Sequence, residues 1–140
     1  MPGETDLAKL LASLDPMLDI REFGYAVVPH GTILPPGFRP LGMFHEDEGV
    51  TLIAPATDLA AAGVGALTGL ARLTMMVQSS LEAVGMTAAM ATALTRSGIS
   101  ANVVAAYHHD HIFVPWDRRH EAVAALRALA AEGQGGGTVS

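Results

Sequence analysis

The chain has 140 residues, a length that suits one compact domain or two small half-domains that share a core. Half of the residues are apolar and only 16% are charged, which excludes disorder caused by an excess of charge. Fourteen acidic against eight basic residues give a net charge of −6, and this acidic balance disfavours nucleic-acid binding.

Cysteine is absent, which excludes disulfides, thiolate nucleophiles and cysteine-based zinc sites. No apolar run approaches the roughly 20 residues that a membrane-spanning helix needs, and the N-terminus lacks the basic region that opens a secretory signal. We therefore expect a cytoplasmic protein that does not enter a membrane.

The first half predicts a short helix, a strand, a loop and a hairpin. Leucines at helical spacing over residues 7–14 predict the helix, and Asp15-Pro16 should end it. Aromatic and β-branched residues over 22–28 predict a strand, while 30–40 hold too much proline and glycine for regular structure. We expect a loop there.

Two short apolar runs, 41–44 and 50–54, are separated by acids and Gly49, a pattern typical of a hairpin whose turn uses a positive φ. The short helix that follows should be capped by Thr57 and closed by Gly63.

The second half begins with a strand in which Leu73, Met75 and Val77 alternate with polar or softer residues. Ser79-Ser80 offers the N-cap of a helix that runs to about Arg96 and ends at Ser97-Gly98. Its expected buried stripe is Leu81, Val84, Ala88, Ala91 and Leu94.

Two further strands, 102–107 and 112–114, should form a second hairpin with His108 to His111 as the turn. A last helix should start near Asp117 and end at Gly133, followed by a disordered tail over 133–140.

The second half lacks one strand of the βαββαβ ferredoxin-like plan. A strand donated by the first half, with 23–28 the best candidate, would fill the gap. Equally, the strand at Leu73 could close a first-half unit whose first helix has become the Pro-rich loop. Sequence alone leaves both pairings open.

The segment 78–115, QSSLEAVGMTAAMATALTRSGISANVVAAYHHDHIFVP, resembles an ACT domain: a strand end, a small-residue turn, a Gly-containing helix, then G-I-x-x-N and a hairpin. More loosely, the whole chain is similar to a pair of such domains. The resemblance implies an α+β, ferredoxin-like (ACT-like) sandwich in which two halves share antiparallel sheets with helices on one face. We place the halves at 1–68 and 69–132.

The resemblance also implies a ligand site at the start of the predicted helix. Unpartnered backbone N–H groups there favour an anion, and Gly85 would let a carboxylate approach the backbone. Asn102, in the family's characteristic asparagine position, could contact the same ligand. The expected ligand-binding residues are Ser79, Ser80, Leu81, Glu82, Val84, Gly85, Asn102 and Val103. Each of these also has a purely structural explanation as a cap, a packing glycine or a turn residue.

A competing signal is the run of His108, His109, Asp110 and His111, which offers imidazoles of the kind that bind zinc, copper or nickel. Neighbouring positions on a hairpin point in different directions, so His109 and His111 are the pair that could meet one ion. A polar hairpin tip or a subunit contact explains the run more simply, and we expect no dedicated metal site and no cofactor. Neither Ser79 nor Ser80 lies in a G-x-S-x-G motif, which would mark a nucleophilic serine. We therefore expect a protein without catalytic activity of its own.

The sequence therefore predicts a regulatory module of the ACT type that binds a small molecule, with an amino acid as the expected ligand, and acts as a homodimer or homotetramer. The alternatives are an interaction protein that keeps the fold without a ligand and, less favoured, a metal-binding protein that uses the histidine hairpin.

Overall fold

The computed structural model describes residues 9, 11–76 and 85–136, with side chains up to residue 132. Six strands form an antiparallel sheet in the order β2-β3-β1-β4-β6-β5. The chain divides into two compact units: unit 1 comprises Met1–Asp19 and Arg72–Ser140, and unit 2 comprises Ile20–Ala71. Each unit is therefore described by itself.

Unit 2 is built on a hairpin and a short helix. β2 (Gly42–Glu46) pairs antiparallel with β3 (Gly49–Pro55), and β3 pairs antiparallel with the second part of β1 (Pro16–Val28). α2 (Ala56–Ala61) follows β3 directly, and the helix is closed by Gly63 at a φ of +73°. The predicted hairpin and short helix are both present. The N-cap of α2 is Pro55 rather than Thr57, because the chain turns from the strand into the helix at the proline.

The Pro-rich loop covers the core of unit 2 where a ferredoxin-like unit has its first helix. Leu34 and Phe38 of this loop pack against a buried cluster to which Leu59 of α2 also belongs. The strands supply the other buried members of that cluster: Ala26, Val28, Val50, Leu52 and Ala54. These two loop side chains therefore cover the core of unit 2 as the apolar face of a helix would.

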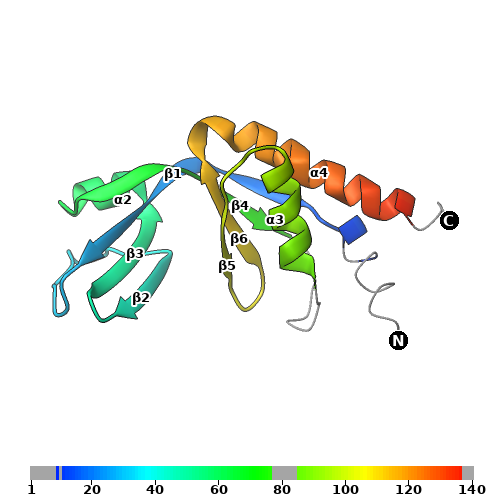
Figure 1. Cartoon of the computed structure of the whole chain (residues 1–140). Coiled ribbons are helices and arrows are strands. Elements are labelled where there is room, and N and C mark those ends of the chain that lie inside the picture. Colours follow the sequence, from blue (N-terminus) through cyan, green and yellow to red (C-terminus); the bar gives the residue numbers. More distant parts are fainter. Residues whose placement is uncertain (1–8, 10, 77–84, 137–140) are drawn as a thin grey trace. The chain divides into compact units, whose positions relative to one another are not determined.

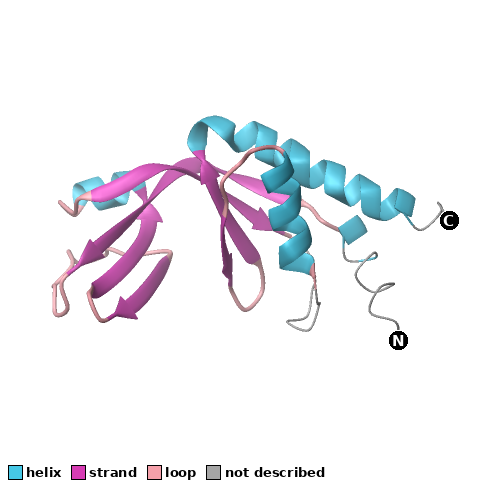
Figure 2. Cartoon of the chain, viewed as in Figure 1, coloured by secondary structure: helices cyan, strands magenta, loops and turns pink. Residues whose placement is uncertain are grey.

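Besides a few helical residues before β1, the described part of unit 1 contains two helices and the hairpin of β5 (Asn102–Ala105) and β6 (Asp110–Pro115) (Figure 2). α3 (Met86–Arg96) and α4 (Arg119–Gly136) pack against each other, and a single 3₁₀ turn (Trp116–Arg118) leads into α4. The core comes from both helices and from alternate residues of β4 (Ala66–Met75), and it includes Leu73, Met75, Met86, Met90, Leu94, Ile112, Val114, Ala122 and Leu126.

The missing strand of unit 1 is supplied by the first residues of β1, which precede the residues 23–28 that we favoured for this role. The backbone N–H of Met76 donates to the carbonyl of Asp15 over 3.0 Å, which ties the start of β1 to the end of β4. The first part of β4, up to Ala71, belongs in turn to unit 2. Each unit thus takes one edge of its sheet from a strand that continues into the other. Both alternatives named the right strands but the wrong residues: 23–28 pair with β3 inside unit 2, and Leu73 lies in unit 1.

Four predicted boundaries were wrong. β1 begins at Pro16, because a proline is tolerated as the first residue of a strand and does not only stop a helix. α3 begins after Gly85, whose φ of +91° is left-handed, and Ala88 on this helix is exposed rather than buried. The second hairpin turns at residues 106–109, so Asp110 and His111 lie in β6. α4 continues beyond Gly133 to Gly136.

The predicted first helix falls largely outside the described residues, but Leu11 and Ala12 are helical and Leu14 is buried. Over the portion of the chain that is described, no helix combines the length and apolar character required to cross a membrane.

Candidate functional site

Three of the eight predicted ligand-binding residues lie in the described part of the chain. Ser79, Ser80, Leu81, Glu82 and Val84 fall outside it. Gly85 is the N-cap of α3 and has a left-handed backbone; its carbonyl accepts the N–H of Ala89 over 2.8 Å. A side chain is disfavoured at that φ, which explains a glycine at this junction.

Asn102 and Val103 begin β5, where they pair with Phe113 and Ile112 of β6. Asn102 is exposed. Gly85 is the N-cap of α3, whereas Asn102 opens β5, which the chain reaches only after the whole helix and the loop over 97–101; Figure 1 shows the course of the chain through these elements. Eleven helical residues rise about 16 Å. The structure does not bring Gly85 and Asn102 together within one copy of unit 1.

A row of polar side chains crosses three neighbouring strands of unit 1. Arg72 on β4 forms an ion pair with Asp19 on β1, with 3.4 Å between guanidinium Nη1 and carboxylate Oδ2. On its other side, Arg72 Nε donates to Nδ1 of His111 on β6 over 3.4 Å. The Thr74 hydroxyl lies 3.1 Å from the same nitrogen. These residues alternate with the buried Leu73 and Met75, so the pleat of β4 places them together on the opposite face.

The surroundings of His111 favour its neutral form. Burial lowers its pKa from the ordinary value of 6.5, and the positive charge of Arg72 and the neighbouring His109 lower it further, while Asp110 acts in the opposite direction. Because Arg72 donates to Nδ1, we assign the proton of the neutral ring to Nε2. The row is thus an ion pair extended by a neutral imidazole.

The histidine hairpin does not assemble a metal site in the described residues. Nδ1 of His111 already accepts from Arg72 and Thr74, and Nδ1 of His109 is buried without a hydrogen-bond partner. No group of three or more His, Cys, Asp or Glu side chains able to hold an ion occurs among residues 9, 11–76 and 85–136. His108 instead packs its ring edge-on to Tyr107, with 4.9 Å between the ring centroids.

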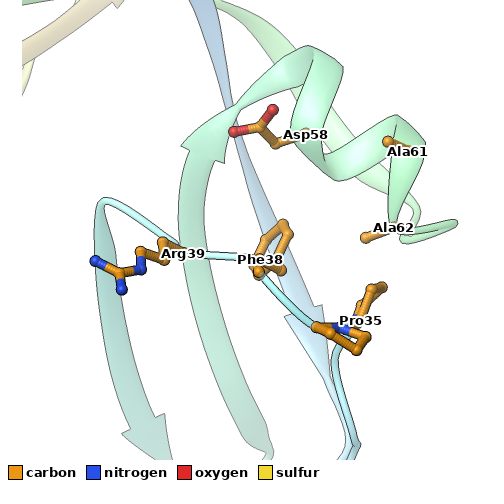
Figure 3. A pocket seen from close by; sticks show the side chains of 8 residues that line it. Pro35, Phe38, Arg39, Asp58, Ala61 and Ala62 are labelled. Atoms are coloured by element: carbon orange, nitrogen blue, oxygen red, sulfur yellow. The ribbon is translucent and has the colours of Figure 1, made fainter.

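Unit 2 contains a pocket that the sequence analysis did not predict. It has a volume of about 240 Å³ and lies between the Pro-rich loop and α2 (Figure 3). The loop contributes Pro35, Pro36, Gly37, Phe38 and Arg39, and the helix contributes Asp58, Ala61 and Ala62. The run of prolines and glycine signals a fixed turn, but no local pattern reveals that residues 35–39 and 58–62 face each other.

A second, more apolar groove of about 420 Å³ lies on the strands of unit 2. It is lined by Tyr25, Ala26, Val27, Thr51, Gly65, Ala66 and Leu67. The lining includes no ionisable group other than the Tyr25 phenol, whose pKa is raised by burial. This groove offers contact area but few directional polar groups.

Comparison with known proteins identifies both halves of the chain. Residues 2–71 match one family model described as an ACT domain, and residues 70–128 match a second model with the same description. The chain is 38% identical to a protein of unknown function from Vibrio cholerae that is called a possible transport protein. That match covers 92% of this chain and 99% of the other, with a TM-score of 0.79. No curated protein matches the chain at a significant level.

Two aspartate kinase structures have the same fold at low identity. The ligand-free regulatory subunit of aspartate kinase from Thermus thermophilus matches with a TM-score of 0.58 and 11% identity, over 84% of this chain and 98% of that one. E. coli aspartokinase III, in complex with aspartate and ADP, matches with a TM-score of 0.59 and 13% identity, over 81% of this chain and 32% of that one.

Proposed function

The chain belongs to the ACT domain family as a tandem pair, and from that premise we propose that it is a regulatory module that binds a small molecule, with free amino acids as the ligand class. The observation that carries the proposal is the extent of the two matches, which together occupy residues 2–128 of 140. The two matches therefore account for most of these 140 residues, and in this proposal the activity that is regulated lies outside them.

The aspartate kinase structures support the choice of amino acids. One is a regulatory subunit of aspartate kinase, and another was solved with aspartate and ADP. At 11% and 13% identity their contacts do not transfer to individual residues here, so the proposal extends to the ligand class and not to aspartate itself.

Within this proposal, the ligand lies between two copies of unit 1. Gly85 precedes α3 with a left-handed backbone, and Asn102 starts β5 near the other end of the helix. We propose a two-fold axis that sets the helix start of one copy beside the Asn102 of the other, because an isologous interface repeats each such contact on both copies. In this proposal the residues 79–84, which precede Gly85 in the sequence, also contact the ligand. The proposal thus requires a homo-oligomer and includes no catalytic step.

A thermal-shift measurement tests the proposal. An amino acid present at about 100 times its Kd stabilises the folded protein by about 2.7 kcal/mol, which raises Tm by several degrees in a protein of this size. We expect at least one of the twenty amino acids to do so. Because Asn102 is exposed, Asn102→Ala should leave the ligand-free Tm unchanged and remove most of the shift. If no amino acid raises Tm of the folded protein, the ligand class is wrong.

A purely structural role is the second candidate, and the exposed apolar residues of unit 2 favour it. Phe44, Val27 and Leu67 are 66%, 60% and 80% exposed, which is unusual for large apolar side chains that meet only water. In this role the chain would present a contact surface and bind no small molecule. A stable oligomer in sedimentation experiments, together with no thermal shift from any amino acid, would favour it over the sensing role.

A further inference from the structure

We propose that unit 2 carries a self-association surface, on which the Phe44 ring of one copy of the chain enters a groove of a second copy. The surface is the face of the sheet opposite α2, and we call it the open face; its residues are Tyr25, Val27, Phe44, Thr51 and Leu67. All five lie in unit 2, so the open face shares no residue with the ligand site proposed in unit 1. This interface goes beyond the proposed function and does not depend on it.

The register of the strands places these side chains on one side of the sheet. Thr51 on β3 lies directly opposite Val27 on β1 and Phe44 on β2, and residues paired in this way point to the same side. The chain neighbours of Val27 and Thr51 belong to the buried cluster that also includes a leucine of α2, so by alternation these two residues point away from that helix. Tyr25 and Leu67 line the same groove as Val27 and Thr51. The five residues therefore form one surface.

A projecting ring and a hollow lie on different strands of the open face. Phe44 is mostly exposed and lies on β2, the edge strand of the sheet. The groove of about 420 Å³ lies over β1 and the start of β4. Adjacent strands are about 4.8 Å apart, so two strand spacings, or roughly 10 Å, separate Phe44 from Val27 in the groove. A single copy thus presents both halves of a contact at separate places.

A two-fold axis parallel to the strands makes these halves complementary. It lays two open faces against each other and exchanges their two sides, so the Phe44 ring of each copy meets the groove of the other. Sheets that pack face to face are about 10 Å apart, a gap that interdigitating side chains fill. A groove alone would accept many partners, whereas a ring and a groove on one surface match the self-complementary patch that an isologous interface requires.

Charge also favours a second copy as the occupant. The chain has a net charge of −6, so two copies repel each other unless they meet at an uncharged surface. Of the five residues of the open face only Tyr25 is ionisable, and burial raises the pKa of its phenol, which keeps it neutral. Glu46 marks the edge of the surface, where its carboxylate accepts from the Thr51 hydroxyl over 2.6 Å. The centre of the contact is therefore free of like charges.

The size of the open face sets the strength of the pair. Val27, Phe44 and Leu67 are each more than half exposed. With an aromatic side chain supplying about 150 to 250 Å², the apolar patch is on the order of 400 Å² per copy. A standard interface buries about 800 Å² per partner, so this one should form a weak pair that depends on concentration.

The test is a concentration series of the full-length protein without ligand, followed by backbone NMR signals. Between about 20 µM and about 1 mM, a range suited to a weak pair, we expect the signals of residues 25–27, 44, 51 and 65–67 to shift along one binding curve. Phe44→Thr keeps a β-branched residue in β2 and should raise the dissociation constant about tenfold or more, because it removes the aromatic anchor. Signals at the groove that do not change with concentration would contradict the interface.

A pair of introduced charges tests the contact itself. Phe44→Lys and Leu67→Glu should each raise the dissociation constant about tenfold or more, because each places a charge in an apolar contact. The double variant should associate again, since the axis sets the new lysine of each copy beside the new glutamate of the other. If the double variant associates no better than either single variant, Phe44 and Leu67 do not meet across the interface and the proposed arrangement is wrong.

Ile33→Lys is the matched control, because Ile33 is exposed on the Pro-rich loop of the same unit and lies outside the open face. It adds the same charge as Phe44→Lys and should leave self-association unchanged. An equal loss in both variants would mean that net charge, and not the open face, governs association.

The same variants keep this interface apart from the ligand site of unit 1. Phe44→Lys should retain any thermal shift that an amino acid causes, since it alters unit 2 alone. Concentration-dependent signals confined to α3 and β5 would overturn the open-face interface and leave the proposed function intact. Loss of association in Phe44→Lys, in a protein that responds to no amino acid, would establish the interface without the ligand site.

Discussion

At the scale of single residues, His111 occupies an unusual place for an imidazole. In a half-buried row, the lone pair of its Nδ1 accepts from Arg72 and lies beside the Thr74 hydroxyl. If that nitrogen were protonated, its N–H would point at the positively charged guanidinium. Protonation therefore costs the hydrogen bond from Arg72 and adds a like-charge contact, whereas the Thr74 hydroxyl can turn to accept the new N–H. The hydrogen bond from Arg72 on β4 to β6 forms only while Nδ1 of the ring is unprotonated, whereas the ion pair between Arg72 and Asp19 on β1 does not depend on the ring.

The free energy of unfolding should consequently fall in acid. Because the pKa of His111 is lower in the folded chain than its ordinary 6.5, the unfolded chain binds more protons once the pH drops below that value. Above about pH 6.5 the ring is neutral in both states, and this loss vanishes. We expect His111→Gln, which keeps an acceptor, to reduce the fall in unfolding free energy measured by urea denaturation between about pH 7.5 and about pH 5.5.

His45→Gln is the matched control, because His45 is exposed on β2. It should retain the pH dependence of the unmodified protein. Identical pH dependence in the His111 variant and the unmodified protein would show that His111 is not the group responsible.

The polar row also shows where reasoning from sequence stops at this scale. The alternation of β4 predicted that Arg72 and Thr74 share one face, and the structure confirms it. Their partners could not be predicted, since Asp19 lies 53 residues from Arg72 and His111 lies 39 away. The sequence predicted His111 in the hairpin turn. In the structure it lies in β6, where it pairs with Val104 of β5.

At the scale of elements, the Pro-rich loop acts as a structural replacement for a helix. It contributes Leu34 and Phe38 to the core of unit 2 and forms a fixed turn at Pro36 and Gly37. Few of its backbone groups need internal partners, because a loop on the surface leaves them to water. Its stability contribution should therefore reside in a few side chains.

Neighbouring residues of this loop provide a direct test. Leu34→Ala removes a partly buried side chain from the core contact and should lower the free energy of unfolding by about 1 to 3 kcal/mol. Ile33 is 94% exposed, so Ile33→Ala should change it by less than about 0.5 kcal/mol. Chemical denaturation of both variants gives the comparison. Equal effects would mean that the loop is not anchored through Leu34.

Elements with strong local signals were predicted well. The β2–β3 hairpin has its acids and glycine at the turn, and a Cβ on Gly49 would lie 2.7 Å from the carbonyl oxygen of Val28. The early start of β1 was missed because Asp15-Pro16 looks like a helix stop. The start of α3 was placed at Ser79-Ser80, which lie outside the described residues, whereas Gly85 carries the left-handed backbone before the helix. A left-handed glycine and a helix-interior glycine look alike in sequence.

At the scale of the whole molecule, the tandem ACT architecture followed from the family resemblance and is confirmed by both family matches. Which strand completes which unit could not be predicted, since pairing between distant strands has no local signature. The answer is that unit 1 is discontinuous in sequence, with unit 2 inserted between Asp19 and Arg72. β1 and β4 both pass through that division.

Separating the chain at the boundary predicted from sequence should therefore disrupt both units. The fragment 1–68 lacks most of β4, and 69–140 lacks the strand that begins at Pro16. We expect neither fragment alone to show a cooperative thermal transition by circular dichroism, because each sheet loses an edge.

A permuted chain provides the positive control. Residues 72–140 followed by a flexible Gly/Ser linker and residues 1–19 contain all of unit 1, and this chain should unfold cooperatively. Cooperative unfolding of 69–140 by itself would show that the start of β1 is dispensable.

The discontinuity also sets an order during synthesis. Domains generally fold as their last residues leave the ribosome, from the N-terminus onward. Unit 2 is complete once Ala71 has emerged, whereas unit 1 still lacks α3, α4 and the second hairpin. The start of β1, which is covalently continuous with the folded unit 2, can pair within unit 1 only after the second half of the chain has been translated.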